Sequence, residues 1–271
     1  MDSRTAATQF RQLHQGPRPL LLPNAWDAGS ARLIQSCGAQ AIATTSAGLA
    51  WSHGYADGGA LPPGILIDAV KEIARVISVP LTVDMEAGYS SELAVIAENA
   101  HALAAAGAVG INLEDGAERP EVLCQRIEAV KRGASRAGVD LFVNARTDVF
   151  LRGLTAPERA PEETIARGEK YRQAGADGLF VPGLVDLAVI RRIVSAVPLP
   201  LNVLVRAGLP PTSELAAVGV RRVSAGSGIS SAVHGLTRRA ARQFLDGAGY
   251  QAMLEGGVPY AELNALFSEK Q

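Results

Sequence analysis

The chain has 271 residues, of which 48% are hydrophobic and 5% aromatic, enough to bury one large core. Its 26 basic and 27 acidic residues nearly cancel, so no charge excess favours nucleic acid or an anionic membrane surface. The two cysteines lack metal-binding spacing, and neither a signal peptide nor a membrane-length apolar run of about 18 residues is recognisable. We therefore expect a cytoplasmic protein.

Short apolar runs recur along the chain, and each ends in polar or small residues. Their starts are spaced by roughly 20 to 40 residues, as strand–helix units require. The predicted strands are Leu20–Trp26, Ala41–Ser46, Leu81–Glu86, Gly110–Asp115, Leu141–Thr147, Gly178–Gly183, Leu201–Val205 and Arg221–Gly226.

Segments with helical periodicity lie between these strands, and several of them end in a glycine just before the next strand. This pattern is typical of a helix that ends in a left-handed residue, and it occurs about five times. The predicted helices are Ser90–Ala106, Glu121–Ala137, Pro161–Ala174 and Asp186–Ala196, with further helical stretches at Ile229–Leu245, Tyr250–Glu255 and Tyr260–Ser268.

Alternating helices and strands predict the α/β class with a parallel sheet. About eight apolar strands favour a closed (β/α)8 TIM-type barrel. An open doubly wound sheet is the alternative, but no G-x-G-x-x-G follows the first strand. We expect one domain over residues 1–271, with 228–271 as a C-terminal helical extension. That extension exceeds one closing helix, and its surplus is expected to pack on a neighbouring subunit, giving a homo-oligomer.

Acidic residues end two neighbouring strands of the predicted barrel. Asp84 and Glu86 lie two residues apart and so share one face of their strand, and Glu114 ends the next strand. Three converging carboxylates require a cation, and oxygen-only ligands suit Mg2+, or Mn2+, better than Zn2+. The alternative is that single acids cap helices or pair with arginine.

Further polar residues follow the other strands. Arg146 could hold a carboxylate or an enolate oxygen, or could form a structural salt bridge to Asp148 or Glu114. Small-residue backbone after the second strand could bind a carboxylate. Asp57 could lie near the metal or be a turn residue. The candidate substrate-binding residues are Thr45, Ser46, Ala47, Gly48, Asp84, Arg146, Asn202 and Arg206.

Five motifs, PNAWDAGSARL, TTSAGL, VDMEAGYS, INLEDG and NARTDVF, occur in this order. Together they resemble the isocitrate lyase and phosphoenolpyruvate mutase superfamily. The resemblance implies a (β/α)8 barrel whose last helix is often exchanged between subunits, giving dimers of dimers, so we expect a homo-oligomer, a dimer or a homotetramer. It also implies Mg2+ held by Asp84, with Glu86 and Glu114 acting largely through water, and reactions that pass through an enolpyruvate-like intermediate.

The resemblance also implies roles for single residues. Ser46, Ala47 and Gly48 match the loop that grips the substrate carboxylate, Asp57 matches a position near the metal, and Arg146 matches the arginine that steadies the enolate oxygen. The expected catalytic residues are Arg146, Glu114 and Asp57.

The sequence departs from the superfamily pattern at several places. The K-K-C-G-H gating motif of the lyases is absent after LED, and Cys124 falls within the following helix. The sixth strand ends in V-P-G where the superfamily has a glutamate. On the seventh strand Asn202 matches, but the two hydroxyl positions are Leu204 and Arg206.

The leading functional prediction is Mg2+-dependent carbon–carbon cleavage of a 2-oxo or 2-hydroxy acid, by retro-aldol reaction or decarboxylation. Arg206 could bind a distal carboxylate, which favours a dicarboxylate. The alternatives are a carbon–phosphorus mutase or hydrolase and a non-catalytic 2-oxo-acid-binding protein. No nucleic-acid or membrane partner is expected, and the sequence does not identify the proton donor.

Overall fold

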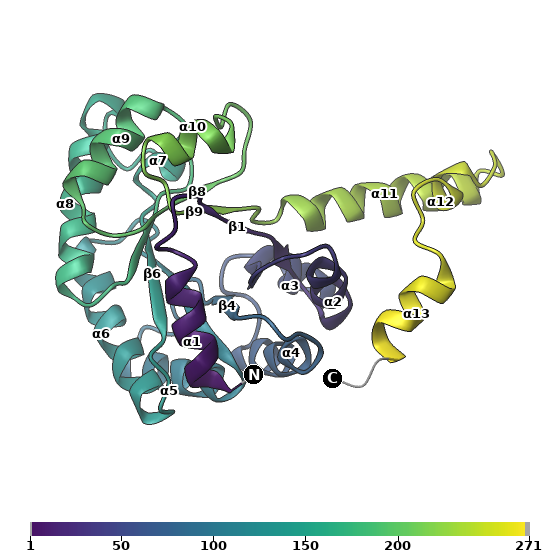
Figure 1. The fold of residues 1–271 in the computed structure, drawn as a ribbon, viewed down its shortest axis with the longest axis horizontal. Helices are drawn as coiled ribbons and strands as arrows, with labels where there is room; N and C mark the ends of the chain where they lie inside the picture. The colour runs from purple at the N-terminus through teal and green to yellow at the C-terminus, as the bar shows by residue number, and fades with distance from the viewer. Residues whose placement is uncertain (1, 269–271) are drawn as a thin grey trace.

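The strands of the computed structural model, which describes residues 2–268, form one parallel sheet (Figure 1). Every predicted strand is present, shorter by one to a few residues in most cases, although β5 begins two residues earlier than predicted. The strands are β1 (Leu20–Leu22), β2 (Asn24–Ala25), β3 (Ile42–Thr44), β4 (Leu81–Asp84), β5 (Ala108–Glu114), β6 (Phe142–Arg146), β7 (Gly178–Phe180), β8 (Leu201–Leu204) and β9 (Arg222–Ser224).

The first strand closes the sheet into a nearly complete barrel. Pro23 interrupts it because proline has no backbone N–H to donate. The part before Pro23, β1, pairs with β9, and the part after it, β2, pairs with β3. One stretch of chain therefore joins the two ends of the sheet, so the nine parallel strands occupy eight positions. The predicted (β/α)8 TIM-type fold is confirmed.

Helices connect the strands and lie on the outside of the barrel (Figure 1). Their apolar faces pack inward, with Ile96, Ile127 and Ile190 fully buried. Apart from α1 and the C-terminal helices, they are α2 (Ala28–Ser36), α3 (Ser46–Ser52), α4 (Pro63–Val76), α5 (Leu93–Ala105), α6 (Pro120–Arg136), α7 (Val149–Arg152), η1 (Pro157–Arg159), α8 (Ala160–Gln173), α9 (Leu187–Ala196) and α10 (Thr212–Ala217).

The amino end of the barrel is closed by α1 (Ser3–Gln12). Its Phe10 is fully buried against β5, where a Cβ on Gly110 would lie only 2.7 Å from the ring. Arg11 pairs with Asp177 at 2.8 Å and with Asp140 at 2.6 Å. With this end plugged, the carboxyl ends of the strands are left as the open face.

The interior of the barrel contains polar side chains where apolar layers are usual. Nη2 of Arg222 on β9 donates to Oδ1 of Asn112 on β5 at 3.3 Å. These strands are not neighbours in the sheet, so the contact crosses the barrel. Asn144 of β6 also donates to Asn112, at 2.9 Å. A hydrogen-bonded polar layer thus lies beneath the carboxyl ends.

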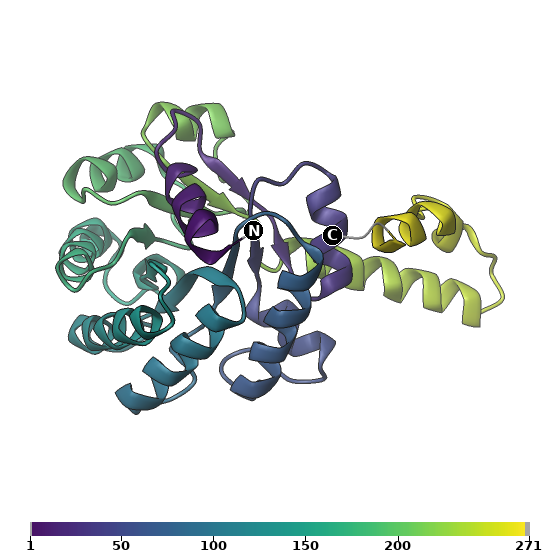
Figure 2. The same cartoon turned by 60° about the horizontal axis from the view of Figure 1, so that its bottom comes forward.

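The C-terminal helices α11 (Gly228–Leu245), α12 (Gln251–Leu254) and α13 (Tyr260–Ser268) form an arm that leaves the barrel (Figure 1, Figure 2). The end of the arm returns toward α2, where Arg32 Nε donates to the Leu266 carbonyl at 2.8 Å. The predicted helical stretches are confirmed, and residues 269–271 of the extension lie outside the described residues. Among residues 2–268, no helix has the length and apolar character to cross a membrane.

His14, which follows α1, is buried in this amino-end plug. Its ring stacks on Phe142 with centroids 4.4 Å apart, and its Nδ1 lies 2.8 Å from the Phe10 carbonyl oxygen. Burial, together with the charge of nearby Arg222, lowers the pKa of His14 to about 3 from its ordinary 6.5. The neutral ring is therefore part of the folded state.

The unfolded chain binds a proton on His14 near pH 6.5, whereas the folded chain does not until about pH 3. The contribution of His14 to the free energy of unfolding is thus complete above pH 6.5 and declines as the pH falls toward 3. When the pH is lowered from about 6 to 4, the free energy of unfolding measured in urea should fall by about 2 kcal/mol less for His14→Phe than for the wild type. The control is His53→Gln, a change at an exposed side chain, which should follow the wild type. Parallel curves for His14→Phe and wild type would contradict this account.

Candidate active site

A small pocket of about 120 Å³ opens at the carboxyl ends of the strands. Asp84 and Arg146, the last residues of β4 and β6, line it from the two strands that flank β5. Six of the residues singled out from the sequence therefore come together at one place, namely Thr45, Ser46, Ala47, Asp57, Asp84 and Arg146.

Asp84 is held by the backbone around it. Its own N–H donates to Thr44 Oγ1 at 2.9 Å, while its carboxylate accepts the N–H groups of Ser46 and Glu86, each at 3.4 Å. Burial raises the pKa of Asp84, and the charge of Arg146 opposes that shift. A carboxylate so enclosed would be stabilised by a cation in the pocket.

The turn after Asp84 contains two residues in the left-handed backbone region, Glu86 at φ 46° and Tyr89 at φ 59°. Such conformations cost about 1–3 kcal/mol each for residues other than glycine, and they cluster at functional sites. The Tyr89 hydroxyl donates to Glu86 Oε1 at 2.8 Å, and the Glu86 carbonyl accepts the N–H of Glu114 at 2.9 Å. Burial and the charges of Asp84 and Asp57 raise the pKa of Glu86, although the Tyr89 hydrogen bond opposes them.

Arg146 lies between two carboxylates. Its Nη1 is 2.8 Å from Glu114 Oε2, and its Nε and Nη2 donate to the two oxygens of Asp148 at 2.7 and 3.2 Å. Burial raises the pKa of Glu114 to about 7, although Arg146 opposes the shift. Burial alone would lower the pKa of Arg146, but the charges of Glu114 and Asp148 outweigh it and raise that pKa. Both salt bridges considered from the sequence are present, and Arg146 also lines the pocket.

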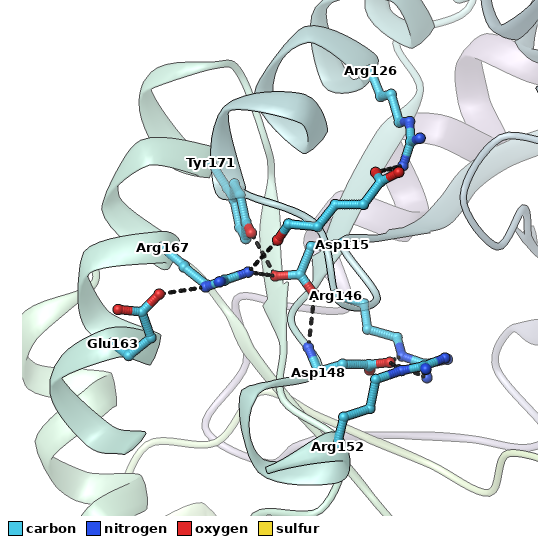
Figure 3. Close-up of polar contacts among 9 residues, drawn as sticks. Asp115, Arg126, Arg146, Asp148, Arg152, Glu163, Arg167 and Tyr171 are labelled. Atoms are coloured by element: carbon cyan, nitrogen blue, oxygen red, sulfur yellow. Dashed lines mark hydrogen bonds and ion pairs between the residues drawn. The ribbon is translucent and has the colours of Figure 1, made fainter. Parts of the chain in front are cut away.

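A second tier of charges fixes Asp148 from behind (Figure 3). Asp148 is fully buried, and its N–H donates to Asp115 Oδ1 at 2.9 Å. The other oxygen of Asp115 accepts Arg167 Nη1 at 2.8 Å and the Tyr171 hydroxyl at 2.6 Å. Because α8 supplies Arg167 and Tyr171, the outer helix layer sets the position of Arg146 through two buried carboxylates.

The candidate metal ligands are near one another without surrounding a single point. Within residues 2–268, no three or more His, Cys, Asp or Glu side chains are grouped closely enough to hold an ion. Asp84 lines the pocket, whereas Glu114 is paired with Arg146 and Glu86 with Tyr89. The donor set is nevertheless all oxygen and includes like charges that raise one another's pKa, which fits a hard divalent cation bound by Asp84.

Besides the metal candidates Glu86 and Glu114, three of the candidate substrate-binding residues lie away from the pocket lining. Gly48 packs under it, because a Cβ there would lie 2.7 Å from Thr45 Cγ2 and 2.9 Å from Trp26 Cβ. Asn202 is fully buried in β8, where its Oδ1 accepts the Ser224 hydroxyl at 3.3 Å. Arg206 is exposed on the loop after β8.

Several lining residues were not singled out from the sequence. Asn24 is one: its Nδ2 donates to the Thr44 carbonyl at 2.7 Å, and its Oδ1 accepts the Gly226 N–H at 2.8 Å. Two-residue alternation on a strand could have indicated Asn112, which precedes Glu114 by two and shares its face. The others, apart from Leu204, which was noted only as a departure, are Phe180, Ser224, Gly226 and Ser227.

The family model described as phosphoenolpyruvate phosphomutase matches residues 10–245. The chain is 37% identical to an uncharacterised protein of Mycobacterium tuberculosis, with 94% of this chain and 95% of the relative covered. It is 30% identical to Escherichia coli 2-methylisocitrate lyase, covering 74% of this chain and 70% of the relative. It is 31% identical to Paraburkholderia xenovorans oxaloacetate decarboxylase, covering 82% and 76%.

A solved structure from Burkholderia cenocepacia, of a protein assigned provisionally to the phosphonomutases, is 41% identical. It superposes with a TM-score of 0.84 and covers 89% of this chain and 100% of that one. The fold and the charged pocket thus define an α/β-barrel enzyme of the lyase or mutase type. The chain belongs to the phosphoenolpyruvate phosphomutase family.

The contribution of the buried Asp115 carboxylate to stability can be tested by mutation. Asp115→Asn would replace an acceptor of Arg167 and Tyr171 by an amide and leave the guanidinium without its buried counter-charge. We expect the free energy of unfolding to fall by about 3 kcal/mol in urea titrations.

The matched control acts on the same arginine at its outer partner. Glu163 pairs with Arg167 at 2.7 Å but its side chain is 37% exposed. Glu163→Gln should therefore cost less than about 1 kcal/mol. Equal losses for the two variants would show that the Asp115 contacts do not carry this stability.

Proposed function

We propose that the chain is a Mg2+-dependent carbon–carbon lyase or decarboxylase acting on a small 2-oxo or 2-hydroxy dicarboxylic acid. The observation that supports this most strongly is the placement of a carboxylate, Asp84, and a guanidinium, Arg146, on the same pocket. Breaking the C3–C4 bond of a 2-oxo acid, one bond away from the oxo carbon, leaves the electron pair of that bond on C3, where it is delocalised onto the oxo oxygen as an enolate. Such a reaction needs positive charge at the oxo oxygen, which a cation and Arg146 would supply together. The lyase and decarboxylase relatives are consistent with this chemistry.

The size of the pocket favours a small substrate. Its volume of about 120 Å³ lies well below the roughly 300–1,000 Å³ that is typical of pockets for drug-sized ligands. Of its charged lining residues, Arg146 is the cation and the rest are acids. A compact acid is therefore the substrate class that the pocket fits.

In this proposal Asp84 binds Mg2+ directly, and Glu86 and Glu114 contact it through water. Their oxygens are engaged by Tyr89 and Arg146, so each would act from a distance. Bound Mg2+ would supply Lewis-acid stabilisation of the developing negative charge. Mn2+ has similar ligand preferences and would fit the same residues.

The protein's own groups would orient the substrate. A guanidinium has five N–H donors, and the contacts of Arg146 with Glu114 and Asp148 use three. The remaining two can donate to an enolate or carboxylate oxygen. Ser46 and Ala47 line the pocket, and in this proposal their backbone N–H groups would hold the substrate carboxylate.

Two exposed residues complete the proposal. Asp57 lines the pocket from an exposed loop, so in this proposal it acts at the rim, near the metal. Arg206 is exposed beyond β8, so it would bind a distal carboxylate from outside the pocket. Asn202, buried in β8 below them, stays a candidate for supporting the bound substrate.

Carbon–phosphorus chemistry is the second candidate, favoured by the family model and by the structure from B. cenocepacia. The loop after Asp115 gives it little support, because it contains no lysine. Its Glu118 is tied down, with a carboxylate oxygen 2.6 Å from Arg126 Nη1 and a carbonyl that accepts Arg167 Nη1 at 3.1 Å. Carbon–carbon cleavage therefore remains the first candidate.

We also propose that the arm formed by α11, α12 and α13 packs on further copies of the chain, giving a dimer or tetramer. Its apolar side chains are strongly exposed, including Leu245 at 80%, Leu254 at 78% and Tyr260 at 84%. Light scattering of the wild type should give a mass two or four times that of the 28.2 kDa chain. A stable 28.2 kDa species at micromolar concentration would contradict the proposal.

The function is tested with 2-oxo and 2-hydroxy dicarboxylic acids of about four to six carbons. Release of pyruvate, glyoxylate or CO2 should disappear with EDTA and return with added Mg2+. Asp84→Asn should lower kcat/KM at least about 100-fold, because it removes the proposed metal ligand.

Asp68→Asn is the control for this variant. Asp68 lies on α4 with an exposed side chain paired to Lys71, so its replacement should leave turnover unchanged. Tight binding of these acids without any turnover would instead support a non-catalytic binding protein. Metal-independent turnover would overturn the proposed role of Mg2+.

A further inference from the structure

Asn112 lines the pocket from the middle of the barrel. It lies on β5 two residues before Glu114, in register with Asp84 on β4, and its residue surface is 7% exposed. It thus sits level with Asp84 and one layer below Glu114, and it contributes to the lining of the pocket.

The orientation of the Asn112 amide is fixed from two sides. Its Oδ1 accepts Asn144 Nδ2 at 2.9 Å and Arg222 Nη2 at 3.3 Å. A guanidinium has only donors, so the atom that faces Arg222 must be the oxygen. Among residues 2–268, no hydrogen bond uses Asn112 Nδ2. The amide N–H2 group therefore points away from its two partners, on a residue that borders the pocket.

Arg222 makes this orientation costly to reverse. Its side chain is buried, with the residue 1% exposed, and no ion pair to it occurs within the described residues. Within residues 2–268 its Nε and Nη1 have no hydrogen-bond partner, so the Asn112 oxygen is the acceptor that the guanidinium uses. Turning the amide over would aim N–H2 at a buried cation.

Space for the second partner is also specific to this sequence. A Cβ on Gly178 would lie 2.8 Å from Asn144 Oδ1, so glycine on β7 leaves room for the Asn144 amide. Strand β6 can then present Nδ2 of Asn144 to Asn112.

We propose that Asn112 is a specificity residue that donates a hydrogen bond from Nδ2 to a substrate oxygen in the pocket. Arg222 and Asn144 act as positioning residues for it. The inference rests on the proposed function and deepens it, since it selects substrates with a carboxylate or oxo oxygen at that position. A substrate with a methyl group there would leave a buried donor unpaired and bind more weakly.

The test measures binding of oxalate, a planar dianion that resembles the enolate of a 2-oxo acid, by calorimetry at saturating Mg2+. Asn112→Asp keeps the shape and the oxygen that Arg222 requires, and replaces the donor by a second acceptor. Asn112→Ala removes the amide and leaves space for water beside Arg222, without adding a charge near the metal. Both variants should bind oxalate at least about tenfold more weakly than the wild type, because a hydrogen bond to a charged group is lost.

Thr82→Val is the control. Thr82 is a buried barrel residue that does not line the pocket, and its Oγ1 has no hydrogen-bond partner. This variant should bind oxalate within about twofold of the wild type. Unfolding temperatures identify any variant that has lost its fold.

The outcomes separate the two proposals. If the wild type binds no oxalate with Mg2+, the proposed function fails. If the wild type binds oxalate and the folded Asn112 variants bind it equally well, the role of Asn112 is overturned while the proposed function stands.

Discussion

The site depends on the two-point hold of Asp148 on Arg146. Asp148 is fully buried and engages Nε and Nη2 of the guanidinium together, which fixes both the position and the plane of the group. Glu114 takes Nη1 on the other side. These contacts also fix the direction of the two remaining N–H donors of Arg146. The guanidinium therefore needs no reorganisation when negative charge develops in the pocket.

Burying the Asp148 carboxylate costs free energy, and contacts from the outer helices of the barrel offset that cost. A buried carboxylate such as Asp148 needs fixed donors, and it receives Arg146 and Arg152 at its side chain. Asp115 then links its backbone to Arg167 and Tyr171 on α8. The polar layer around Asn112 extends the same principle into the barrel, where Arg222 is buried with an amide oxygen as its partner.

The fold could be predicted from the sequence because two local patterns repeat along the chain. Apolar runs marked the strands, and glycines before them marked helix ends, for example Gly138 and Gly175, both at positive φ. The split of the first strand was not predicted, since it follows from pairing of β1 and β2 with different neighbours around Pro23.

The site could be predicted from the sequence only in part. Polar residues that end an apolar run are easy to recognise, whereas polar residues within a run are not. Asp84 and Arg146 terminate apolar runs and do line the pocket. Asn112 lies inside a run, where only its two-residue spacing from Glu114 could have indicated it, and its register with Asp84 became visible in the structure. Arg146 is the last residue of β6, whereas Arg206 lies two residues beyond the end of β8 and is exposed. Strand position predicts the face, whereas the loop that follows decides where an end residue points.

The central claim is that a divalent cation binds Asp84 opposite Arg146. Crystals soaked with Mn2+ and oxalate, measured for anomalous scattering, test it directly. The account predicts one strong peak beside the Asp84 carboxylate, with oxalate between the ion and the guanidinium of Arg146. A peak elsewhere, or oxalate that bypasses Arg146, would contradict the account.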